Sequence, residues 1–299
     1  MKRADAGHRA GFIAIIGRPN VGKSTLLNRL VGQKLSITSS KAQTTRHRVA
    51  AILTRADAQF VFVDTPGFQT ERGGALNRLL NHVVTDALRT VDVVAFVVEA
   101  GRFDARDKRV LALLPPAVPV VLVINKVDRL ADKRKLLPFI QQLMDSAKFA
   151  AVVPISALRG TQIEPLIEEL CAQLPRAEPF YEAEQVTDRD ERFFAAEFLR
   201  EKLFRLLGEE LPYSTNVTID KFEQQGALRR IAASIQVDKP AHKKMVIGED
   251  GAKLKTIASQ ARKDMERLFG GKVFLEVWVK IKRGWADDER ALGQLGYRR

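Results

Sequence analysis

Residues 17–24 read Gly-Arg-Pro-Asn-Val-Gly-Lys-Ser, the GxxxxGK[ST] spacing of a phosphate-binding loop. An apolar run precedes this loop and a helical pattern follows it, which is the local context that such a loop requires. Backbone N–H groups can then surround phosphates, and the N-terminus of the helix adds a positive dipole. The Lys23 amine can reach the β- and γ-phosphates, and the Ser24 hydroxyl can ligate Mg²⁺. The residues expected to hold the nucleotide are Gly17, Arg18, Pro19, Asn20, Val21, Gly22, Lys23, Ser24 and Thr25.

Two later segments decide which base is bound. The segment 125–128, Asn-Lys-Val-Asp, follows a predicted buried strand and should lie at the carboxyl edge of a sheet. A carboxylate at Asp128 can accept hydrogen bonds from N1–H and the 2-amino group of guanine, and adenine has no such donor pair. Ser-Ala-Leu at 156–158 resembles the loop whose backbone N–H, here that of Ala157, meets guanine O6. GTP and GDP are therefore the predicted ligands. The residues expected near the base are Asn125, Lys126, Asp128, Ser156, Ala157 and Leu158.

The segment 64–67, Asp-Thr-Pro-Gly, ends another predicted strand and is a candidate switch. Asp64 can hold Mg²⁺ through a water molecule, and the Gly67 N–H can bond the γ-phosphate, a bond that exists only with GTP bound. A threonine before the second strand should complete the Mg²⁺ shell; we favour Thr45, and Thr44 stays open. The predicted metal ligands are Ser24, Thr45 and Asp64, and Thr65 and Pro66 are expected beside the nucleotide.

Hydrolysis at this site is expected to be slow. Phe68 stands where Ras-type proteins place a water-orienting glutamine, and an apolar ring cannot orient water. Asn20 resembles a feature of GTPases in which a bound K⁺ supplies the positive charge of an arginine finger, so K⁺ is a candidate cofactor beside Mg²⁺. The residues expected to act in catalysis are Asn20, Lys23, Thr45, Asp64 and Gly67.

Strand and helix patterns alternate from residue 12 to residue 174 and must position these motifs. Near-continuous apolar strands separated by helices are typical of a mostly parallel α/β sheet with helices on both faces. Two of the strands are separated only by residues 55–58, which predicts a hairpin and one antiparallel strand. The six expected strands are 12–17, 49–54, 59–64, 93–99, 118–125 and 150–156. The expected helices are 24–31, about 74–89, 106–114, 133–148 and 161–174.

A second, α+β domain is expected after residue 190. Pro175 ends the last helix of the first domain, and the proline- and acid-rich residues 175–190 predict a linker. The order that follows is α-β-β-α-α-β. Its expected helices lie at 192–207, just before Gly248 and at 252–268, and its strands at 213–222, 228–238 and 272–282. The predicted division is an N-terminal segment (1–10), a nucleotide-binding domain (11–174), a linker (175–190), the second domain (191–283) and a tail (284–299).

Gly-Glu-Asp-Gly at 248–251 lies between the two later helices. A lone GxxG is also an ordinary helix–helix turn, but here apolar residues precede it and a basic amphipathic helix follows. This order matches a type II KH domain, whose GxxG loop clamps the backbone of about four nucleotides. The acidic pair at 249–250 stands where such domains often carry a basic residue, which lowers the expected affinity. The residues expected to contact RNA are Lys243, Lys244, Val246, Ile247, Gly248, Glu249, Asp250, Gly251, Lys253 and Lys255.

The charge of the chain also indicates a polyanionic partner. The formal net charge is +13, with +9 in residues 1–59 and +8 in residues 225–283. Such blocks attract RNA phosphates or an anionic membrane surface, and a generally basic, well-solvated protein is the simpler alternative. One cysteine excludes an internal disulfide, and four scattered histidines offer no zinc spacing. No stretch reaches the roughly 18 apolar residues of a membrane span, so we expect a cytoplasmic protein.

The whole chain resembles the bacterial Era GTPase family. The resemblance rests on GRPNVGKST at 17–25, TTRHR at 44–48, DTPG at 64–67, NKVD at 125–128, SAL at 156–158, KKMVIG at 243–248 and WADDERALGQLGY at 285–297. It implies a GTP-hydrolysing switch whose KH domain binds 16S ribosomal RNA near its 3′ end and assists biogenesis of the 30S ribosomal subunit. It also implies GTP-dependent exposure of the RNA site and a loose peripheral association with the inner face of the cell membrane. We expect a monomer that does not bind DNA.

Two other readings of the sequence stay open. One is an RNA-binding scaffold with an inert nucleotide domain, against which the presence of Lys23, Asp64 and Asp128 argues. The other is a membrane-associated GTPase whose basic blocks meet anionic lipid. Strand-like alternation in the second domain argues against an amphipathic membrane helix as its main device.

Overall fold

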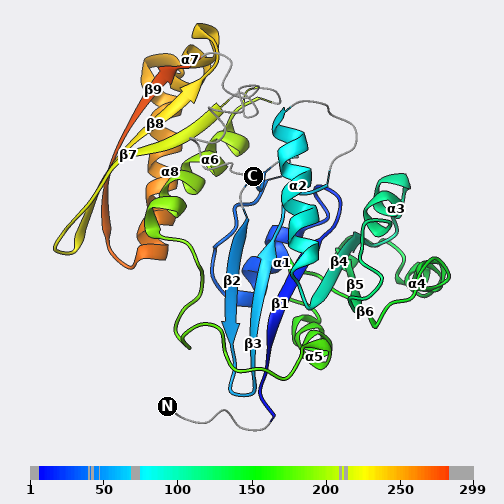
Figure 1. Cartoon of the computed structure of the whole chain (residues 1–299). Coiled ribbons are helices and arrows are strands. Elements are labelled where there is room, and N and C mark those ends of the chain that lie inside the picture. The colour runs from blue at the N-terminus through cyan, green and yellow to red at the C-terminus, as the bar shows by residue number, and fades with distance from the viewer. Residues whose placement is uncertain are drawn as a thin grey trace. The chain divides into compact units, whose positions relative to one another are not determined.

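The computed structural model describes residues 7–39, 41, 44–46, 48–68, 75–208, 211 and 215–282. Contacts divide them into two compact units, whose elements are labelled in Figure 1. Among the described residues, the first unit takes in 7–36, 45–68 and 80–188, and the second takes in 37–44, 75–79 and 189–282. None of the helices in this described part of the chain is both long and apolar enough to cross a lipid bilayer.

The first unit is built on a six-stranded sheet in the order β2-β3-β1-β4-β5-β6. Neighbouring strands are parallel except β2 and β3, which pair antiparallel through a tight turn. The predicted α/β sheet with a single antiparallel strand is therefore confirmed. Its strands are β1 (Arg9–Ile16), β2 (Val49–Thr54), β3 (Ala58–Asp64), β4 (Val93–Glu99), β5 (Val120–Asn125) and β6 (Ala151–Pro154).

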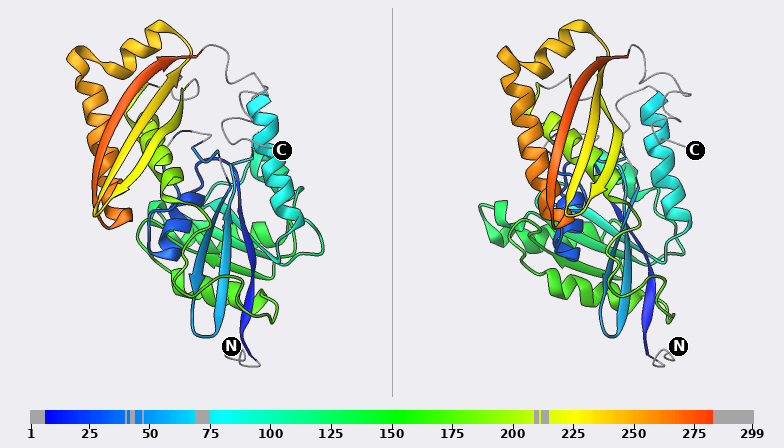
Figure 2. Two further views of the ribbon diagram at one scale, coloured as in Figure 1. Left: turned by 60° about the vertical axis from the view of Figure 1, so that its left-hand side comes forward. Right: turned by 90° about the vertical axis from the view of Figure 1, so that its left-hand side faces the viewer.

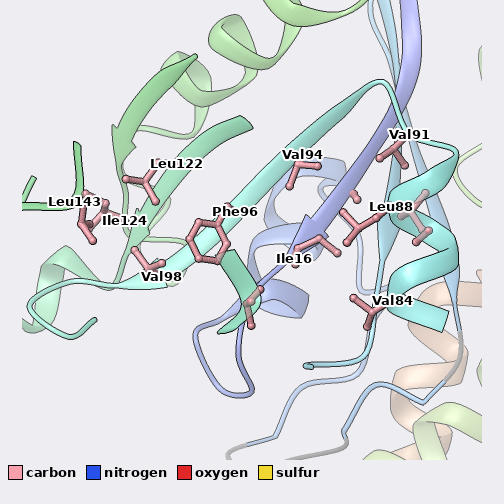
Figure 3. Close-up of a cluster of buried hydrophobic side chains, with 14 residues drawn as sticks. Ile16, Val84, Leu88, Val91, Val94, Phe96, Val98, Leu122, Ile124 and Leu143 are labelled. Carbon is pink, nitrogen blue, oxygen red and sulfur yellow. The ribbon is translucent and has the colours of Figure 1, made fainter. Parts of the chain in front are cut away.

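Helices cover both faces of this sheet. On one face, buried side chains of α2 (Ala75–Arg89), α3 (Ala105–Leu111) and α4 (Leu136–Met144) join those of β1, β4 and β5 in one apolar cluster. Figure 3 shows Val84 and Leu88 of this cluster beside Val94 and Ile16. The helices α1 (Lys23–Val31) and α5 (Ile163–Gln173) pack against each other and bury leucines against the strands. Burial of this apolar surface stabilises the sheet by about 25 cal/mol per Å². It thereby fixes the relative positions of the strand ends that carry the motifs.

Three of the observed helices are shorter than the sequence pattern predicts, and the helix expected at 161–174 spans Ile163–Gln173. The helix expected at 106–114 ends at Leu111 and is followed by a turn. Leu114 precedes Pro115, and the residue before a proline avoids the helical conformation, so the helix cannot extend to the predicted end. The helix expected at 133–148 begins as a single 3-10 turn at Lys133–Lys135 and continues as α4, with Pro138 in its first turn, where proline is tolerated. The predicted start near Gly74 lies outside the described residues.

Residues 175–188, within the predicted linker, run along the first unit. Ala10 N–H donates to the Pro175 carbonyl at 3.2 Å, and Ile52 N–H donates to the Val186 carbonyl at 2.9 Å. The buried Gln59 side chain accepts from the backbone N–H groups of Phe180 and Tyr181 at 2.7 and 2.9 Å. Part of this segment therefore extends the edge of the sheet by backbone pairing.

The second unit is a three-stranded sheet in the order β7-β8-β9 with α6 and α8 packed together on it (Figure 2). β7 and β8 are antiparallel, whereas β8 and β9 are parallel. The element order α-β-β-α-α-β is the predicted one. The elements are α6 (Glu191–Leu206), β7 (Thr215–Gln225), β8 (Leu228–Val237), α7 (Pro240–Ile247), α8 (Ala252–Phe269) and β9 (Lys272–Ile281).

Charged side chains are buried inside this second unit. The Glu201 carboxylate accepts hydrogen bonds from the N–H and hydroxyl of Thr38 at 3.0 and 3.3 Å. The Lys202 amine lies 2.8 Å from Glu201 and 2.5 Å from Asp264 of α8. These pairs satisfy charges that would otherwise be costly to bury. They also attach the segment around Thr38 to α6.

Candidate nucleotide site and RNA-binding loop

The loop between β1 and α1 wraps around the Lys23 side chain. The Lys23 amine donates to the carbonyl oxygens of Gly17 and Arg18, at 3.0 Å each. Gly17 has no room for a side chain, since a Cβ there would lie 2.4 Å from the Val97 carbonyl oxygen. Gly22 has a φ of 103°, a left-handed conformation that favours glycine. The backbone geometry thus requires the two glycines of the predicted motif.

Lys23 lies in an environment that is short of negative charge. Burial lowers its pKa to about 8, although the Asp64 carboxylate raises it and Arg18 lowers it further. Bound phosphates would provide the anionic partner that favours the charged form of a buried lysine. This lysine is therefore suited to binding a polyphosphate.

The three predicted Mg²⁺ ligands lie close together. Asp64 Oδ2 accepts a hydrogen bond from the Ser24 hydroxyl at 3.1 Å and from the Thr45 hydroxyl at 3.4 Å. The two hydroxyl oxygens are 3.0 Å apart. Thr44 instead donates its hydroxyl to the Lys41 carbonyl at 2.7 Å. The geometry favours Thr45 over Thr44 as the metal ligand.

The Asp64 carboxylate is suited to a divalent cation. Burial raises its pKa, against the hydrogen bond from Ser36, the charge of Lys23 and the hydroxyls of Ser24 and Thr45. Its Oδ1 atom is buried and accepts no hydrogen bond from any described residue. A buried carboxylate oxygen in need of a partner, beside two hydroxyls, matches the oxygen ligands that Mg²⁺ prefers.

The side chain of Asn125 connects three loops of the nucleotide site. Its Nδ2 donates to the Val21 carbonyl at 2.9 Å, and its Oδ1 accepts from Lys126 N–H at 2.7 Å and Ala157 N–H at 3.0 Å. Guanine O6 would therefore have to share the Ala157 N–H with this oxygen. The side chain itself is buried, at 1% exposure. Asn125 fixes the spacing between the phosphate loop and the two base-reading segments.

Asp128 is oriented by the last loop of the site. The Ser156 hydroxyl donates to Asp128 Oδ1 at 2.6 Å and accepts from Arg159 N–H at 3.1 Å. The Leu158 side chain is 61% exposed, and the Leu158 carbonyl accepts a hydrogen bond from the Arg29 guanidinium at 2.8 Å. Among the described residues only Ser156 donates to this carboxylate, and it does so to Oδ1, which is compatible with the guanine-reading role predicted for Asp128.

An acidic residue that the sequence pattern missed links the phosphate loop to the base-reading loop. Glu99, at the end of β4, pairs with Arg18 at 2.9 Å through one carboxylate oxygen and with Lys126 at 3.0 Å through the other. Arg18 also pairs with Asp107 of α3 at 3.1 Å and is 5% exposed. The Arg18 side chain is therefore engaged by acidic residues of the protein, whereas its carbonyl lies in the loop. No local spacing signals this bridge, because its members are far apart in sequence.

The candidate switch begins against the phosphate loop. The Thr65 hydroxyl donates to the Ile15 carbonyl at 3.1 Å. A Cβ on Gly67 would lie 2.9 Å from backbone atoms of Pro19, so only glycine allows this close approach. Phe68 packs against the apolar cluster of the first unit. A partly buried apolar ring packed against this cluster leaves this position without a water-orienting group.

The GxxG loop places backbone between α7 and α8. Gly248, Asp250 and Gly251 have φ values of 74°, 46° and 76°, and Gly251 is the N-cap of α8. Val246 is buried beneath the loop, whereas the acidic pair at 249–250 is exposed. The predicted lysines at 244, 253 and 255 are exposed, and Lys243 is half-buried. The predicted loop therefore presents both backbone and lysines at the surface.

Known protein families match both halves of the chain. The sequence model of a 50S ribosome-binding GTPase family matches residues 12–126, and that of a KH domain matches residues 210–286. Together with the fold and the motifs, these matches define the class of protein: a P-loop GTPase joined to a KH domain.

Curated relatives narrow this class to one family. GTPase Era of Nitrosomonas eutropha is 56% identical over 292 residues, which cover 98% of this chain and 99% of the relative. GTPase Era of Chromobacterium violaceum is also 56% identical, with the same coverage. The chain belongs to the Era family of GTPases.

Two solved structures of Era resemble the whole chain. Era in complex with MgGDPNP and nucleotides 1506–1542 of 16S ribosomal RNA superposes with a TM-score of 0.94 at 35% identity, covering 98% of this chain and all of that one. A point variant of Aquifex aeolicus Era bound to GDP and AlF4⁻ superposes with a TM-score of 0.93 at 35% identity, covering 97% and 100%. The likeness spans both units of the fold.

Proposed function

We propose that this GTPase is a Mg²⁺-dependent switch that binds 16S ribosomal RNA near its 3′ end through its KH domain and assists assembly of the 30S subunit. The observation that carries the nucleotide half is the convergence of Ser24, Thr45 and Asp64 beside the buried Lys23. Support for the RNA half comes from the exposed GxxG loop and from the similar structure of Era that contains nucleotides 1506–1542 of 16S ribosomal RNA.

Each side chain of the site has a role in this proposal. Lys23 neutralises the β- and γ-phosphates, and Asp128 selects guanine. Ser24, Thr45 and Asp64 would hold Mg²⁺, which supplies positive charge against the phosphate oxygens when it is bound. The Gly67 N–H donates a hydrogen bond to the γ-phosphate, which couples the conformation of the switch to the presence of GTP. Since Phe68 offers only an apolar ring packed against the core, hydrolysis by the chain alone is slow.

A two-variant experiment tests the two halves separately. Lys23→Ala should abolish GTP binding and leave the binding of RNA covering nucleotides 1506–1542 intact. Gly251→Asp should weaken RNA binding and leave GTP hydrolysis unchanged. Gly251→Asn is the matched control: the two side chains meet the same open space, with no atom within 4 Å of a Cβ, and the same φ of 76°.

The comparison of the two Gly251 variants isolates charge. Unit charges 4 Å apart interact by about 1 kcal/mol in water, so Gly251→Asp should bind RNA at least about fivefold more weakly than Gly251→Asn. Equal affinity of the two variants and the unaltered protein in fluorescence anisotropy would contradict the clamp assignment.

We also propose that K⁺ assists hydrolysis at Asn20. This residue has a φ of 65° in the phosphate loop, a strained conformation that places its side chain at a defined point beside the phosphates. The turnover rate should then be higher in K⁺ than in Na⁺ at equal ionic strength. Equal rates in the two salts would count against this role.

We further propose that the protein acts as a cytoplasmic monomer with loose membrane contact and no affinity for DNA. The two basic blocks of the sequence favour an anionic partner, and RNA and anionic lipid compete as candidates. RNA pull-down and liposome flotation at matched ionic strength distinguish them. Tight flotation combined with weak RNA binding would favour the membrane reading.

A further inference from the structure

A third hydroxyl reaches the Asp64 carboxylate, and no sequence motif contains it. The Ser36 hydroxyl donates to Asp64 Oδ2 at 2.5 Å. Both side chains are buried, with exposures of 3% for Ser36 and 0% for Asp64. An O–H···O⁻ bond of this length lies in the range of charge-assisted hydrogen bonds, which are about twice as strong as neutral ones.

Ser36 is itself held in place by α1. The Asn28 side chain donates from Nδ2 to the Ser36 carbonyl at 2.7 Å. Its Oδ1 accepts from the backbone N–H groups of Leu35 and Ser36 at 2.9 and 2.8 Å. The neighbouring side chains of Leu35 and Ile37 are buried, at 2% exposure each. Three hydrogen bonds from one amide thus tie this turn to the helix that begins at Lys23 and Ser24.

The three hydroxyls that donate to Asp64 differ in whether they are predicted to bind the metal. Ser24 and Thr45 are the predicted Mg²⁺ ligands, so the lone pairs of their oxygens are required by the metal. Ser36 is not a predicted ligand, and among the described residues the only acceptor for its hydroxyl is Asp64. Its hydroxyl can therefore hold the carboxylate in one orientation whether or not the metal is bound.

We propose that Ser36, clamped by Asn28, is a positioning residue that orients Asp64 toward the Mg²⁺ of the nucleotide complex. This inference rests on the proposed Mg²⁺-dependent function. Outer partners that orient metal ligands commonly account for 10- to 100-fold in metal affinity. Removal of the Ser36 hydroxyl should therefore raise the Mg²⁺ requirement of the protein rather than only lower its stability.

The test measures the rate of release of a fluorescent GDP analogue from the full-length protein as a function of Mg²⁺ concentration. For Ser36→Ala, the Mg²⁺ concentration that half-suppresses release should rise at least about tenfold. In EDTA, the release rates of Ser36→Ala and the unaltered protein should agree within about threefold. Urea denaturation of both proteins, followed in parallel, reports the loss of stability.

Ser234→Ala is a matched control in the second unit. The Ser234 hydroxyl is also buried and also donates to a carboxylate, that of Asp220. This variant should lose stability without any change in the Mg²⁺ half-point. Asn28→Asp is the second test variant, because its carboxylate can still accept from the Leu35 and Ser36 N–H groups, whereas its second oxygen replaces the donor to the Ser36 carbonyl and repels that carbonyl. It should shift the half-point in the same direction as Ser36→Ala and by a smaller factor.

The outcomes separate this inference from the proposed function. The positioning role is overturned if GDP release from the unaltered protein depends on Mg²⁺ but both variants have the same Mg²⁺ half-point as that protein. The Ser36–Asp64 hydrogen bond would then be purely structural. Release from the unaltered protein that does not depend on Mg²⁺ would overturn the proposed function itself. If Ser36→Ala does not fold, Asn28→Asp decides: an unchanged half-point refutes the inference, and a raised one supports it.

Discussion

Replacement of Asn125 by alanine tests whether one side chain organises the nucleotide site. The variant removes three hydrogen bonds at once, to the Val21 carbonyl and from the N–H groups of Lys126 and Ala157. Each such bond contributes about 1 kcal/mol net, so the free energy of unfolding of the first unit should fall by about 3 kcal/mol, or roughly 150-fold in the folding equilibrium.

Nucleotide binding should also weaken in Asn125→Ala. Without the amide, the phosphate loop and the two base-reading loops must be ordered by the ligand, and that ordering reduces affinity. We expect GDP to bind at least about tenfold more weakly, measured by titration of a fluorescent analogue. Urea denaturation followed by circular dichroism measures the change in stability.

The matched control for this prediction is Gln141→Ala on α4. Gln141 is exposed, and its amide donates to Asp145 at 3.0 Å, one turn further along the chain. Its removal should change the unfolding free energy by less than about 0.5 kcal/mol. An Asn125→Ala variant whose unfolding free energy stays within about 1 kcal/mol of that of the unaltered protein, and whose GDP affinity stays within about threefold, would contradict the organising role of Asn125.

Three further predictions concern Asp128, Glu99 and Lys202. Asp128→Asn should shift the nucleotide preference away from GTP and toward XTP, whose C2 carbonyl suits an amide donor; full retention of GTP selectivity in competition binding would contradict the base-reading role. Burial raises the pKa of Glu99, but hydrogen bonds and charges from its two basic partners outweigh it and the pKa is lowered. Stabilisation by a carboxylate with a lowered pKa is present above its ordinary pKa of 4.5 and is lost as the pH falls. The difference in melting temperature between the unaltered protein and Glu99→Gln should therefore be largest near neutral pH and should become small at acidic pH. A difference that does not vary with pH would refute a stabilising role of the ionised Glu99 carboxylate. Lys202→Met should destabilise the second unit by about 3 kcal/mol in urea denaturation, because it removes the cation between the buried Glu201 carboxylate and the partly buried Asp264 carboxylate. A loss below about 0.5 kcal/mol would show that the two carboxylates are satisfied without Lys202.

Most of the fold follows from patterns that are local in sequence. Apolar runs and helical periodicity predict six strands of the first unit, and the element order α-β-β-α-α-β of the second, because these patterns reflect which faces must be buried. Element ends are less well predicted, as the early end of α3 at Leu111 illustrates. The end of a helix depends on capping and on neighbouring prolines as much as on periodicity.

In the nucleotide site, too, residues that are consecutive in sequence could be predicted, whereas contacts between distant segments could not. The glycines at 17 and 22, Lys23 and Ser24 could be predicted together because a phosphate loop is made by consecutive residues. The sequence favours Thr45 over Thr44 but does not exclude Thr44, since both lie at plausible distances along the chain. The structure favours Thr45 because only its hydroxyl reaches Asp64.

The sequence by itself determined the class of chemistry of this GTPase: phosphate binding, guanine selection and an RNA-clamping loop are each carried by a few adjacent residues. Only the tertiary structure decided how those motifs support one another. Glu99 meets Arg18 across 81 positions of the chain, and Ser36 meets Asp64 across 28 positions. Such contacts exist because packing of the sheet and its helices brings distant strand ends and loops within hydrogen-bond distance, and no spacing within the sequence records that approach.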